Sequence, residues 1–459
     1  MSFGSKILKY REEMLRDLAR LVAIPSVRSE AREGMPFGEN SARALQTILA
    51  MADEMGLKTK NVANYAGHAE YGEGRETAAV LAHVDVVPAG EGWKTDPYVM
   101  TVRDGLCYGR GTADDKGAAI AALYGLKVLQ EEKVQTKRRI RAIFGAGEET
   151  ASEDMARYFE VEPLPEMGFT PDAEYGICNR EKGILRMDLT GRLGESGVIV
   201  SLRGGTVCNA VPAFADAELR CSAGQFQALR QAAEQAEGNF TFTQADFGGH
   251  VHSVGIASHA ATPQEGVNAV VRLLRLLGQV FTERELGALA SFVNRAIGLE
   301  LDGESLGVKV CDQESGTITV NLGVCHISEN ENRVCLDMRY PVTADGGQLA
   351  RTIQEHAGRF GVAATVEGHS KPLYLPEHSP LISILKESYR VVTGEEAGIY
   401  AMGGGTYARS LQSRGVAFGL LFPDEPDRRI HNTGEHIEIE KFMLHAQVCL
   451  EAMYRMAVE

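Results

Sequence analysis

The spacing of apolar residues predicts strands and helices that follow one another along the first part of the chain. Residues 5–23 carry apolar side chains at helical spacing, which predicts an amphipathic helix that ends before Pro25. Residues 78–87 (AAVLAHVDVV) form an apolar run with a single histidine and a single aspartate, as in a buried strand of a parallel sheet. Residues 115–130 return to helical spacing. This order indicates an α/β fold with a mostly parallel sheet.

The pattern changes between about residues 183 and 372. Stretches such as SGVIVSLRGG and NRVCLDMRYPV alternate apolar and polar residues, which is typical of antiparallel strands with one covered face. Helical spacing returns near the end, at residues 440–457. The sequence therefore predicts an α/β domain formed by residues 1–182 and 373–459, interrupted by an α+β domain at residues 183–372.

Composition narrows the class of protein. The 459 residues are 44% hydrophobic and 24% charged, which is ordinary for a globular protein, and the formal net charge is -15. No apolar run approaches the roughly 18–20 residues of a membrane span, and the first residues do not resemble a secretory signal. The acidic balance argues against nucleic-acid and membrane partners. The eight cysteines form no CxxC pair and are predicted to be reduced thiols, so we expect a cytoplasmic enzyme.

Polar residues inside the apolar strand are the first chemical signal. His83 and Asp85 are two residues apart near the strand's carboxyl end, so both are predicted to point to one face of the sheet, where α/β proteins place their sites. A carboxylate beside a histidine is the usual arrangement that orients a metal-binding imidazole. For an isolated His-x-Asp, however, a hydrogen-bonded core histidine is the commoner interpretation.

Further acids and a histidine lie at the ends of other predicted elements. Each alone has an ordinary explanation, because paired carboxylates often cap helices and a lone aspartate or histidine is usually structural. Together they suit a site with two zinc-type ions and an activated water. These candidates are Asp114–Asp115, Glu148–Glu149, Asp172 and His431.

Four motifs in this order carry a family resemblance: AHVDVVPAGEGW, YGRGTADDKG, GAGEE and TPDAEY. Together they resemble the dinuclear zinc metallopeptidase superfamily that includes carboxypeptidase G, aminoacylase and carnosinase. Through VVPAGEGW and GFTPDAEY the chain resembles the PepV-type dipeptidases most. The resemblance extends from residue 24 to residue 431. It implies a catalytic domain with an inserted α+β lid that is ferredoxin-like and doubled.

The resemblance also implies a ligand set. His83 and Asp172 would bind one metal ion, Glu149 and His431 would bind the other, and Asp114 would bridge both. The two ions are expected to be divalent, with zinc first and manganese or cobalt as alternatives, because carboxylate-rich sites accept all three.

The resemblance assigns two more roles and shows one departure. Asp85 would orient His83, and Glu148 would act as the general acid/base that serves a water shared by the two ions. The peptide bond after Asp114 would be cis. Members of the family often have Asn-Glu three and four residues after the last histidine, whereas here Gly434 precedes Glu435.

Substrate-binding residues are expected in the lid and in a glycine-rich turn. His259 resembles the family's lid histidine, which donates to the developing oxyanion. Asn209 and Arg339 resemble the groups that hold the substrate's C-terminal carboxylate, for which an arginine fork is well suited. In MGGGTYAR, Gly404 and Gly405 let backbone N–H groups approach the substrate, although such a turn is more often only a turn.

The sequence therefore favours hydrolysis of dipeptides, with a small peptide as the binding partner and a monomer as the expected state, since a doubled lid needs no second subunit. Three activities of the same superfamily stay open: an N-acyl-amino-acid deacylase, an aminotripeptidase and a carboxypeptidase. A non-catalytic binding protein is the alternative from another class. It would lack a metal ligand or Glu148, and all of these positions are occupied.

Overall fold

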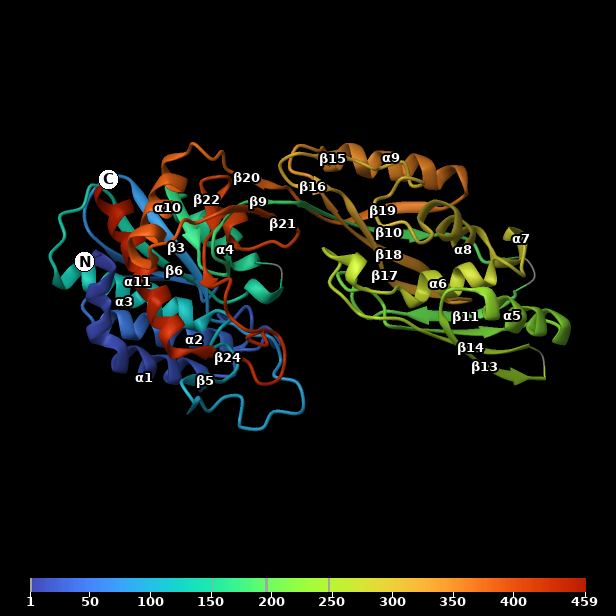
Figure 1. Cartoon of the computed structure of the whole chain (residues 1–459), viewed down its shortest axis with the longest axis horizontal. Coiled ribbons are helices and arrows are strands. Elements are labelled where there is room, and N and C mark those ends of the chain that lie inside the picture. Colours follow the sequence, from blue (N-terminus) through green and yellow to red (C-terminus); the bar gives the residue numbers. More distant parts are fainter. Residues whose placement is uncertain (1, 151, 195–196, 247) are drawn as a thin grey trace. The chain divides into compact units, whose positions relative to one another are not determined.

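The computed structural model describes residues 2–150, 152–194, 197–246 and 248–459, and the chain divides into two compact units (Figure 1). Unit 1 comprises residues 1–180, 373–400 and 405–459, and unit 2 comprises residues 181–372 and 401–404. The sequence assigned residues 401–404 to the catalytic domain, but they join unit 2. The reason is local, because the carbonyls of Met402 and Gly403 accept hydrogen bonds from Lys182 and Arg339.

Unit 1 is built on a mixed sheet in the order β1-β2-β6-β3-β7-β22-β9-β20, in which β2 pairs antiparallel with β1 and β6, β22 pairs antiparallel with β9, and β21 also pairs with β9. Strands β6, β3, β7 and β22 run parallel. The strands of this sheet are β1 (Lys58–Val62), β2 (Ala66–Tyr71), β3 (Thr77–His83), β6 (Arg139–Gly145), β7 (Met167–Thr170), β9 (Ile177–Glu181), β20 (Leu373–Tyr374), β21 (Ile399–Met402) and β22 (Gly415–Ala417). Short strands outside it are β4 (Thr101–Arg103), β5 (Leu106–Tyr108), β8 (Ala173–Glu174), β23 (Leu420–Leu421) and β24 (His436–Glu438).

Helices cover both faces of this sheet. One core joins the sheet to α2, α3 and α11, and a smaller core joins the opposite face to α4 and η5. The helical segments of unit 1 are η1 (Phe3–Tyr10), α1 (Arg11–Val22), α2 (Glu39–Glu54), α3 (Lys116–Glu131), η2 (Glu148–Thr150), α4 (Glu153–Val161), α10 (Pro380–Thr393), η5 (Tyr407–Leu411) and α11 (Ile439–Val458).

Strand β3 shows why an unbroken apolar run predicts a central strand. Every residue of β3 is buried. Ala78 and Val80 belong to the core beneath α3, whereas Ala79 and Leu81 face the core beneath α4, so both faces need apolar side chains. The strand ends at His83, which is earlier than the predicted residue 87, and the segment between it and α3 contains β4 and β5.

Unit 2 is an α+β unit around an eight-stranded antiparallel sheet in the order β13-β14-β12-β11-β17-β18-β10-β19. Its strands are β10 (Gly183–Thr190), β11 (Ile199–Gly204), β12 (Phe214–Leu219), β13 (Asn239–Ala245), β14 (Gly248–Val254), β17 (Thr319–Ser328), β18 (Asn332–Tyr340) and β19 (Ala363–Ser370), with a separate pair β15 (Cys311–Asp312) and β16 (Gly316–Thr317). Its helical segments are α5 (Ala223–Gln235), η3 (Pro263–Glu265), α6 (Ala269–Leu277), α7 (Glu283–Leu286), α8 (Ala288–Phe292), η4 (Val293–Ile297) and α9 (Gly346–Arg359). A ferredoxin-like topology for each half stays a prediction.

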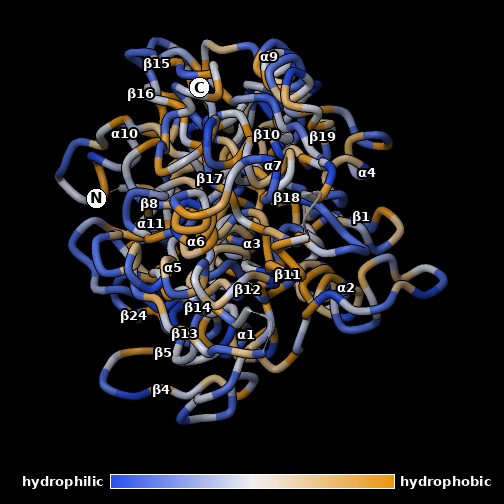
Figure 2. The backbone as a smooth tube through the Cα atoms, turned by 90° about the vertical axis from the view of Figure 1, so that its right-hand side faces the viewer, coloured by the Kyte–Doolittle hydropathy of each residue, from blue (hydrophilic) through white to orange (hydrophobic). Residues whose placement is uncertain are grey.

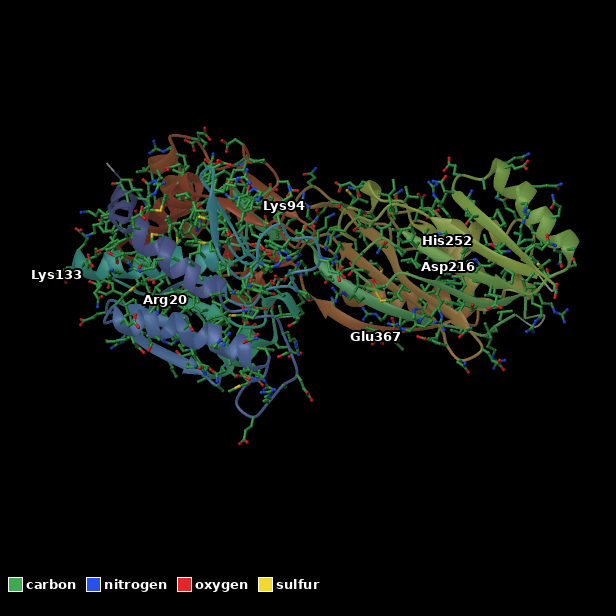
Figure 3. All side chains as sticks on the ribbon, turned by 90° about the horizontal axis from the view of Figure 1, so that it is seen from below. Arg20, Lys94, Lys133, Asp216, His252 and Glu367 are labelled. Carbon is green, nitrogen blue, oxygen red and sulfur yellow. A yellow bond between two sulfur atoms is a disulfide. The ribbon has the colours of Figure 1, made fainter. Side chains whose placement is uncertain are left out.

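The two faces of this sheet differ in polarity. In β18, Leu336 and Met338 point into the apolar core that the sheet shares with α6. Helix α6 is a largely hydrophobic segment in Figure 2. The opposite face is polar. Asp216 and His252 lie side by side there, with His252 Nδ1 2.8 Å from Asp216 Oδ1 (Figure 3). The alternating sequence therefore encodes one covered and one polar face, as expected for an antiparallel sheet.

The prediction of eight reduced cysteines is wrong for one pair. Cys208 and Cys335 form a disulfide, with their Cα atoms 5.8 Å apart. The two cysteines are 127 residues apart in sequence, so no local motif indicates that they pair. Tertiary structure brings them together, because β17 pairs with both β11 and β18. Among the described residues, no helix combines the length and the apolar character that a membrane span needs.

We predict that His68 of β2 contributes to acid sensitivity. Burial, and then the positive charge of Arg141, lower the pKa of His68 from 6.5 to about 4. The unfolded chain therefore binds a proton as the pH falls through 6.5, while the folded protein does not. Stability is fully present above about pH 6.5 and is lost towards pH 4, by up to about 1.4 kcal/mol per pH unit.

Urea unfolding between pH 4 and 7, in buffer with a chelator, should show a shallower acid slope for His68→Gln than for the parent protein. Glutamine keeps an acceptor for Tyr158, whose hydroxyl lies 2.8 Å from His68 Nδ1. The exposed His378→Gln variant serves as the control and should keep the parent slope. Equal slopes for all three proteins would contradict the prediction.

Candidate metal centre

The carboxyl ends of three parallel strands bring most of the predicted site together. His83 is the last residue of β3 and lies opposite Gly145, the last residue of β6. Glu148 and Glu149 form the η2 turn just after β6, and Asp172 follows the end of β7. Because parallel strands end at the same edge of a sheet, these side chains reach one region.

Asp114 lies between two histidines in this region. Its Oδ1 is 3.0 Å from His83 Nε2, and its Oδ2 is 3.0 Å from His431 Nε2. His431 Nε2 also lies 3.2 Å from Glu149 Oε2, and His83 Nε2 lies 4.0 Å from Asp172 Oδ2. The two oxygens of Asp114 thus face different histidines, as in a carboxylate that bridges two ions. The peptide bond after Asp114 is cis, as the resemblance implied.

Donor atoms converge in two groups. His83, Asp114 and Glu149 offer atoms within 4.8 Å of one another, and so do His83, Glu148 and Asp172. The second group contains Glu148 beside the expected ligands His83 and Asp172, although the resemblance assigns proton transfer, not metal binding, to Glu148. His431 adopts a φ of 60°, a left-handed conformation that is uncommon for a residue with a side chain and is found disproportionately at functional sites.

Asp85 connects His83 to the η2 turn. Its carbonyl oxygen lies 3.0 Å from His83 Nδ1, and its Oδ1 lies 3.5 Å from the same atom. In a neutral ring, a hydrogen bond from Nδ1–H to this carbonyl would leave Nε2 as the atom available to a metal ion. The carboxylate of Asp85 also accepts the backbone N–H groups of Glu148 and Glu149 at 3.2 and 3.1 Å, a second task that the sequence did not suggest.

The electrostatics of the region are dominated by negative charge. Burial, and then the charge of Asp172, raise the pKa of Glu148 well above its usual range. Burial, and then the charge of Asp114, raise the pKa of Asp172 to about 7. Burial would also raise the pKa of Asp114, but hydrogen bonds with His431 and His83 lower it instead. Hydrogen bonds with Asp114 and Glu149 raise the pKa of His431 to about 11.

Comparison with protein families identifies the chain. Residues 79–455 match the model described as "Peptidase family M20/M25/M40". This protein belongs to that family. It is 33% identical over 470 residues to the Bacillus subtilis (strain 168) protein named "Putative dipeptidase YtjP", with 100% of both chains covered. It is also 33% identical over 469 residues to a Staphylococcus aureus (strain MRSA252) protein named "Putative dipeptidase SAR1836", with 99% of both covered.

Solved structures agree with this M20 peptidase in fold. Human carnosine dipeptidase 1 has a TM-score of 0.57 at 16% identity and covers 99% of this chain and 98% of its own. The Saccharomyces cerevisiae dipeptidase Dug1p has a TM-score of 0.59 at 12% identity, with 98% and 97% covered. The resemblance read from the sequence is therefore confirmed, and the protein is a metallopeptidase with a mixed α/β fold.

The residues present fit the metal ions of the family. Asp114, Glu148, Glu149 and Asp172 place four carboxylates around two imidazoles, a set of nitrogen and oxygen donors that divalent zinc, manganese and cobalt accept. Burial, and then the repulsion between carboxylates, raise the pKa values of Glu148 and Asp172, and nearby divalent cations would favour the charged form of both.

Glu435 is a functional residue whose role the sequence did not reveal. It is fully buried, and its carboxylate accepts the backbone N–H groups of Gly111, Ala113 and Asp114 at 3.0 to 3.1 Å. Arg110 Nη1 donates to the same carboxylate at 2.6 Å. Glu435 thus shapes the loop that presents Asp114. The sequence shows an acidic residue shortly after His431, but the loop that this residue holds lies more than 300 residues earlier in the chain.

Two further contacts hold the loops around the centre. Buried Lys116, at the start of α3, donates to the carbonyls of Leu21 and Ile24 at 2.9 and 2.8 Å. Asp154 of α4 accepts the N–H of Gly147 at 2.8 Å and the hydroxyl of Tyr407. The first contact ties the start of α3, directly after Asp115, to the end of α1, and the second fixes the residue before Glu148. Neither was predicted from the sequence.

The predicted lid residues are distributed between the two units. Asn209, His259, Arg339 and Gly404 belong to unit 2, whereas Gly405 belongs to unit 1. Arg339 is buried, and its guanidinium donates to both carboxylate oxygens of Asp337 and, at 2.7 Å, to the carbonyl of Gly403. The arginine is therefore held beside the glycine-rich turn.

We predict that Glu435→Gln weakens metal binding. An uncharged amide supports the three N–H groups and Arg110 less well, so the Asp114 loop should lose its fixed geometry. The metal affinity is expected to fall about 10- to 100-fold, as for other residues that support metal ligands. Titration with zinc by calorimetry measures the change. Exposed Glu33→Gln is the matched control, and an unchanged affinity for Glu435→Gln would contradict the role given to it.

Proposed function

We propose that this M20 peptidase hydrolyses the peptide bond of dipeptides with two divalent metal ions, zinc being the first candidate. The observation that carries the proposal is the Asp114 carboxylate, which presents one oxygen to His83 and the other to His431. The names of the full-length relatives from B. subtilis and S. aureus support the substrate class.

In this proposal His83 and Asp172 would hold one ion and Glu149 and His431 the other, and Asp114 would offer one carboxylate oxygen to each. When bound, the two ions supply a Lewis acid and a lowered water pKa. Asp85 positions the His83 ring through its carbonyl and the Glu148 backbone through its carboxylate.

Glu148 is proposed to move the proton. Its carboxylate lies in one donor group with His83 and Asp172, so it would be within reach of a water held there, from which it would accept a proton that it returns to the leaving amine. Its backbone N–H donates to Asp85, so the turn is fixed while the side chain carries out the transfer.

The lid is proposed to stabilise the oxyanion and the substrate carboxylate. His259 Nδ1 accepts the N–H of Ala261 at 3.2 Å, so the neutral ring carries its proton on Nε2, as an oxyanion donor requires. Arg339 and Asn209 would bind the C-terminal carboxylate, with the N–H groups of Gly404 and Gly405 as further donors. A clamp for a free carboxylate favours short substrates.

We predict that Glu148→Gln separates metal binding from turnover. The variant should retain two metal ions per chain, because Glu148 is not a proposed ligand, while kcat falls about 100- to 10,000-fold with the loss of proton transfer. Elemental analysis and dipeptide kinetics measure the two quantities. Exposed Glu160→Gln should resemble the parent protein. Retention of parent-level kcat would refute the role of Glu148.

A substrate panel tests the proposed specificity. A dipeptide should be cleaved with a kcat/KM at least about 100-fold above that of the same dipeptide with an acetylated amino group, because a site that binds a free amino group rejects an analogue that lacks it. N-acetyl amino acids and tripeptides complete the panel. Faster cleavage of an N-acetyl amino acid would make the protein a deacylase, and faster cleavage of a tripeptide would make it a tripeptidase.

A further inference from the structure

The disulfide of unit 2 joins two segments that carry proposed substrate-binding residues. Cys208 lies in the segment between β11 and β12, directly before Asn209. Cys335 lies in β18, four residues before Arg339. Because side chains alternate along a strand, Cys335, Asp337 and Arg339 share one face of β18. The bond therefore links the Asn209 segment to the face of β18 that carries Arg339.

The segment after β11 lies directly on β17. A Cβ atom on Gly323 would come within 2.0 Å of the carbonyl oxygen of Cys208, and one on Gly205 would come within 1.9 Å of the carbonyl oxygen of Gly323. Buried Asn321 donates to the carbonyls of Cys208 and Ala210 at 3.2 and 2.9 Å. Glycines thus allow the close approach, and one amide fixes the backbone on either side of Asn209.

The same segment is also connected to His259. The carbonyl of Asn209 accepts the N–H of Ala260 at 3.0 Å, and the N–H of Val211 donates to the carbonyl of Ser258 at 2.9 Å. Asn209 and His259 are therefore held together by backbone hydrogen bonds, which do not depend on the disulfide. Arg339, the other residue proposed to bind the substrate carboxylate, does not depend on these hydrogen bonds, since it is held by Asp337 and by the carbonyl of Gly403.

We propose that Cys208 and Cys335 are positioning residues, whose disulfide sets the spacing between Asn209 and Arg339 and thereby the affinity for the substrate's C-terminal carboxylate. This inference rests on the proposed function. A dithiol reductant cleaves this disulfide. It gives two electrons and two protons, the Cys208–Cys335 bond breaks into two thiols, and the reductant forms its own disulfide. The hydrogen bonds from Asn321 persist, so the fold survives while the spacing is no longer covalently fixed.

Thiol counting establishes whether the bond forms. The folded, air-oxidised protein should show six free thiols after denaturation without reductant, and eight after reduction. Mass spectrometry of unreduced peptides should show Cys208 joined to Cys335. Eight free thiols in the oxidised protein would overturn the inference, whatever the activity.

Kinetics with two matched substrates test the positioning role. A dipeptide and its C-terminal amide differ only in the carboxylate that the clamp would bind. Reduction of the parent protein, or Cys208→Ser with Cys335→Ser, should lower the dipeptide-to-amide ratio of kcat/KM about fivefold or more, chiefly through KM for the dipeptide. A purely structural role would lower both substrates alike and leave the ratio unchanged, which would refute the inference.

Controls separate this inference from the proposed function. Cys311→Ser removes an exposed free thiol of the same unit and should keep the parent ratio in both redox states. Reoxidation of the reduced parent should restore the ratio, whereas the Ser variants should not respond. Metal ions are kept in excess over the reductant. If the oxidised, metal-loaded parent cleaves no dipeptide, the proposed function fails and with it the positioning role, while the thiol count still decides whether the disulfide exists.

Discussion

The repulsion among the carboxylates at the carboxyl edge of one parallel sheet is the constraint on which unit 1 depends. Such a cluster is costly in a folded protein unless cations or protons neutralise it. Hydrogen bonds from the backbone, together with Arg110, hold the loops that carry these carboxylates. Glu435 accepts hydrogen bonds from three N–H groups of the Asp114 loop, and Asp85 accepts hydrogen bonds from two N–H groups of the η2 turn. These bonds hold the proposed ligands in place, and their negative charge remains to be neutralised by metal ions.

Part of this arrangement could be predicted from the sequence. The apolar run of β3 predicts a central parallel strand, and the family resemblance carried by four short motifs implies the proposed ligands that meet around Asp114. The distances between them could not be predicted. His83, Glu149 and Asp172 lie at or just after the ends of strands, whereas His431 lies in the loop between β23 and β24, where only the resemblance indicates it.

Other features depend on contacts between distant segments. Asp85 lies beyond the end of β3, so its carboxylate reaches η2, whereas periodicity had placed it on the strand. Glu435 and the loop it supports are more than 300 residues apart, and Cys208 and Cys335 are 127 apart. A single sequence records no such pairing. Residues 401–404 join unit 2 through two hydrogen bonds that composition does not reveal.

The position of β22 has a consequence for how the chain is made. This strand spans Gly415–Ala417, yet in the sheet it lies between β7 and β9, which are translated long before it. His431 is translated later still. A ribosome-bound chain therefore exposes an incomplete sheet and an incomplete set of proposed ligands until nearly all of it has been synthesised, while residues 181–372, which form most of unit 2, have already emerged. Premature termination between residues 404 and 415 would leave a chain with all of unit 2 but without β22 and His431.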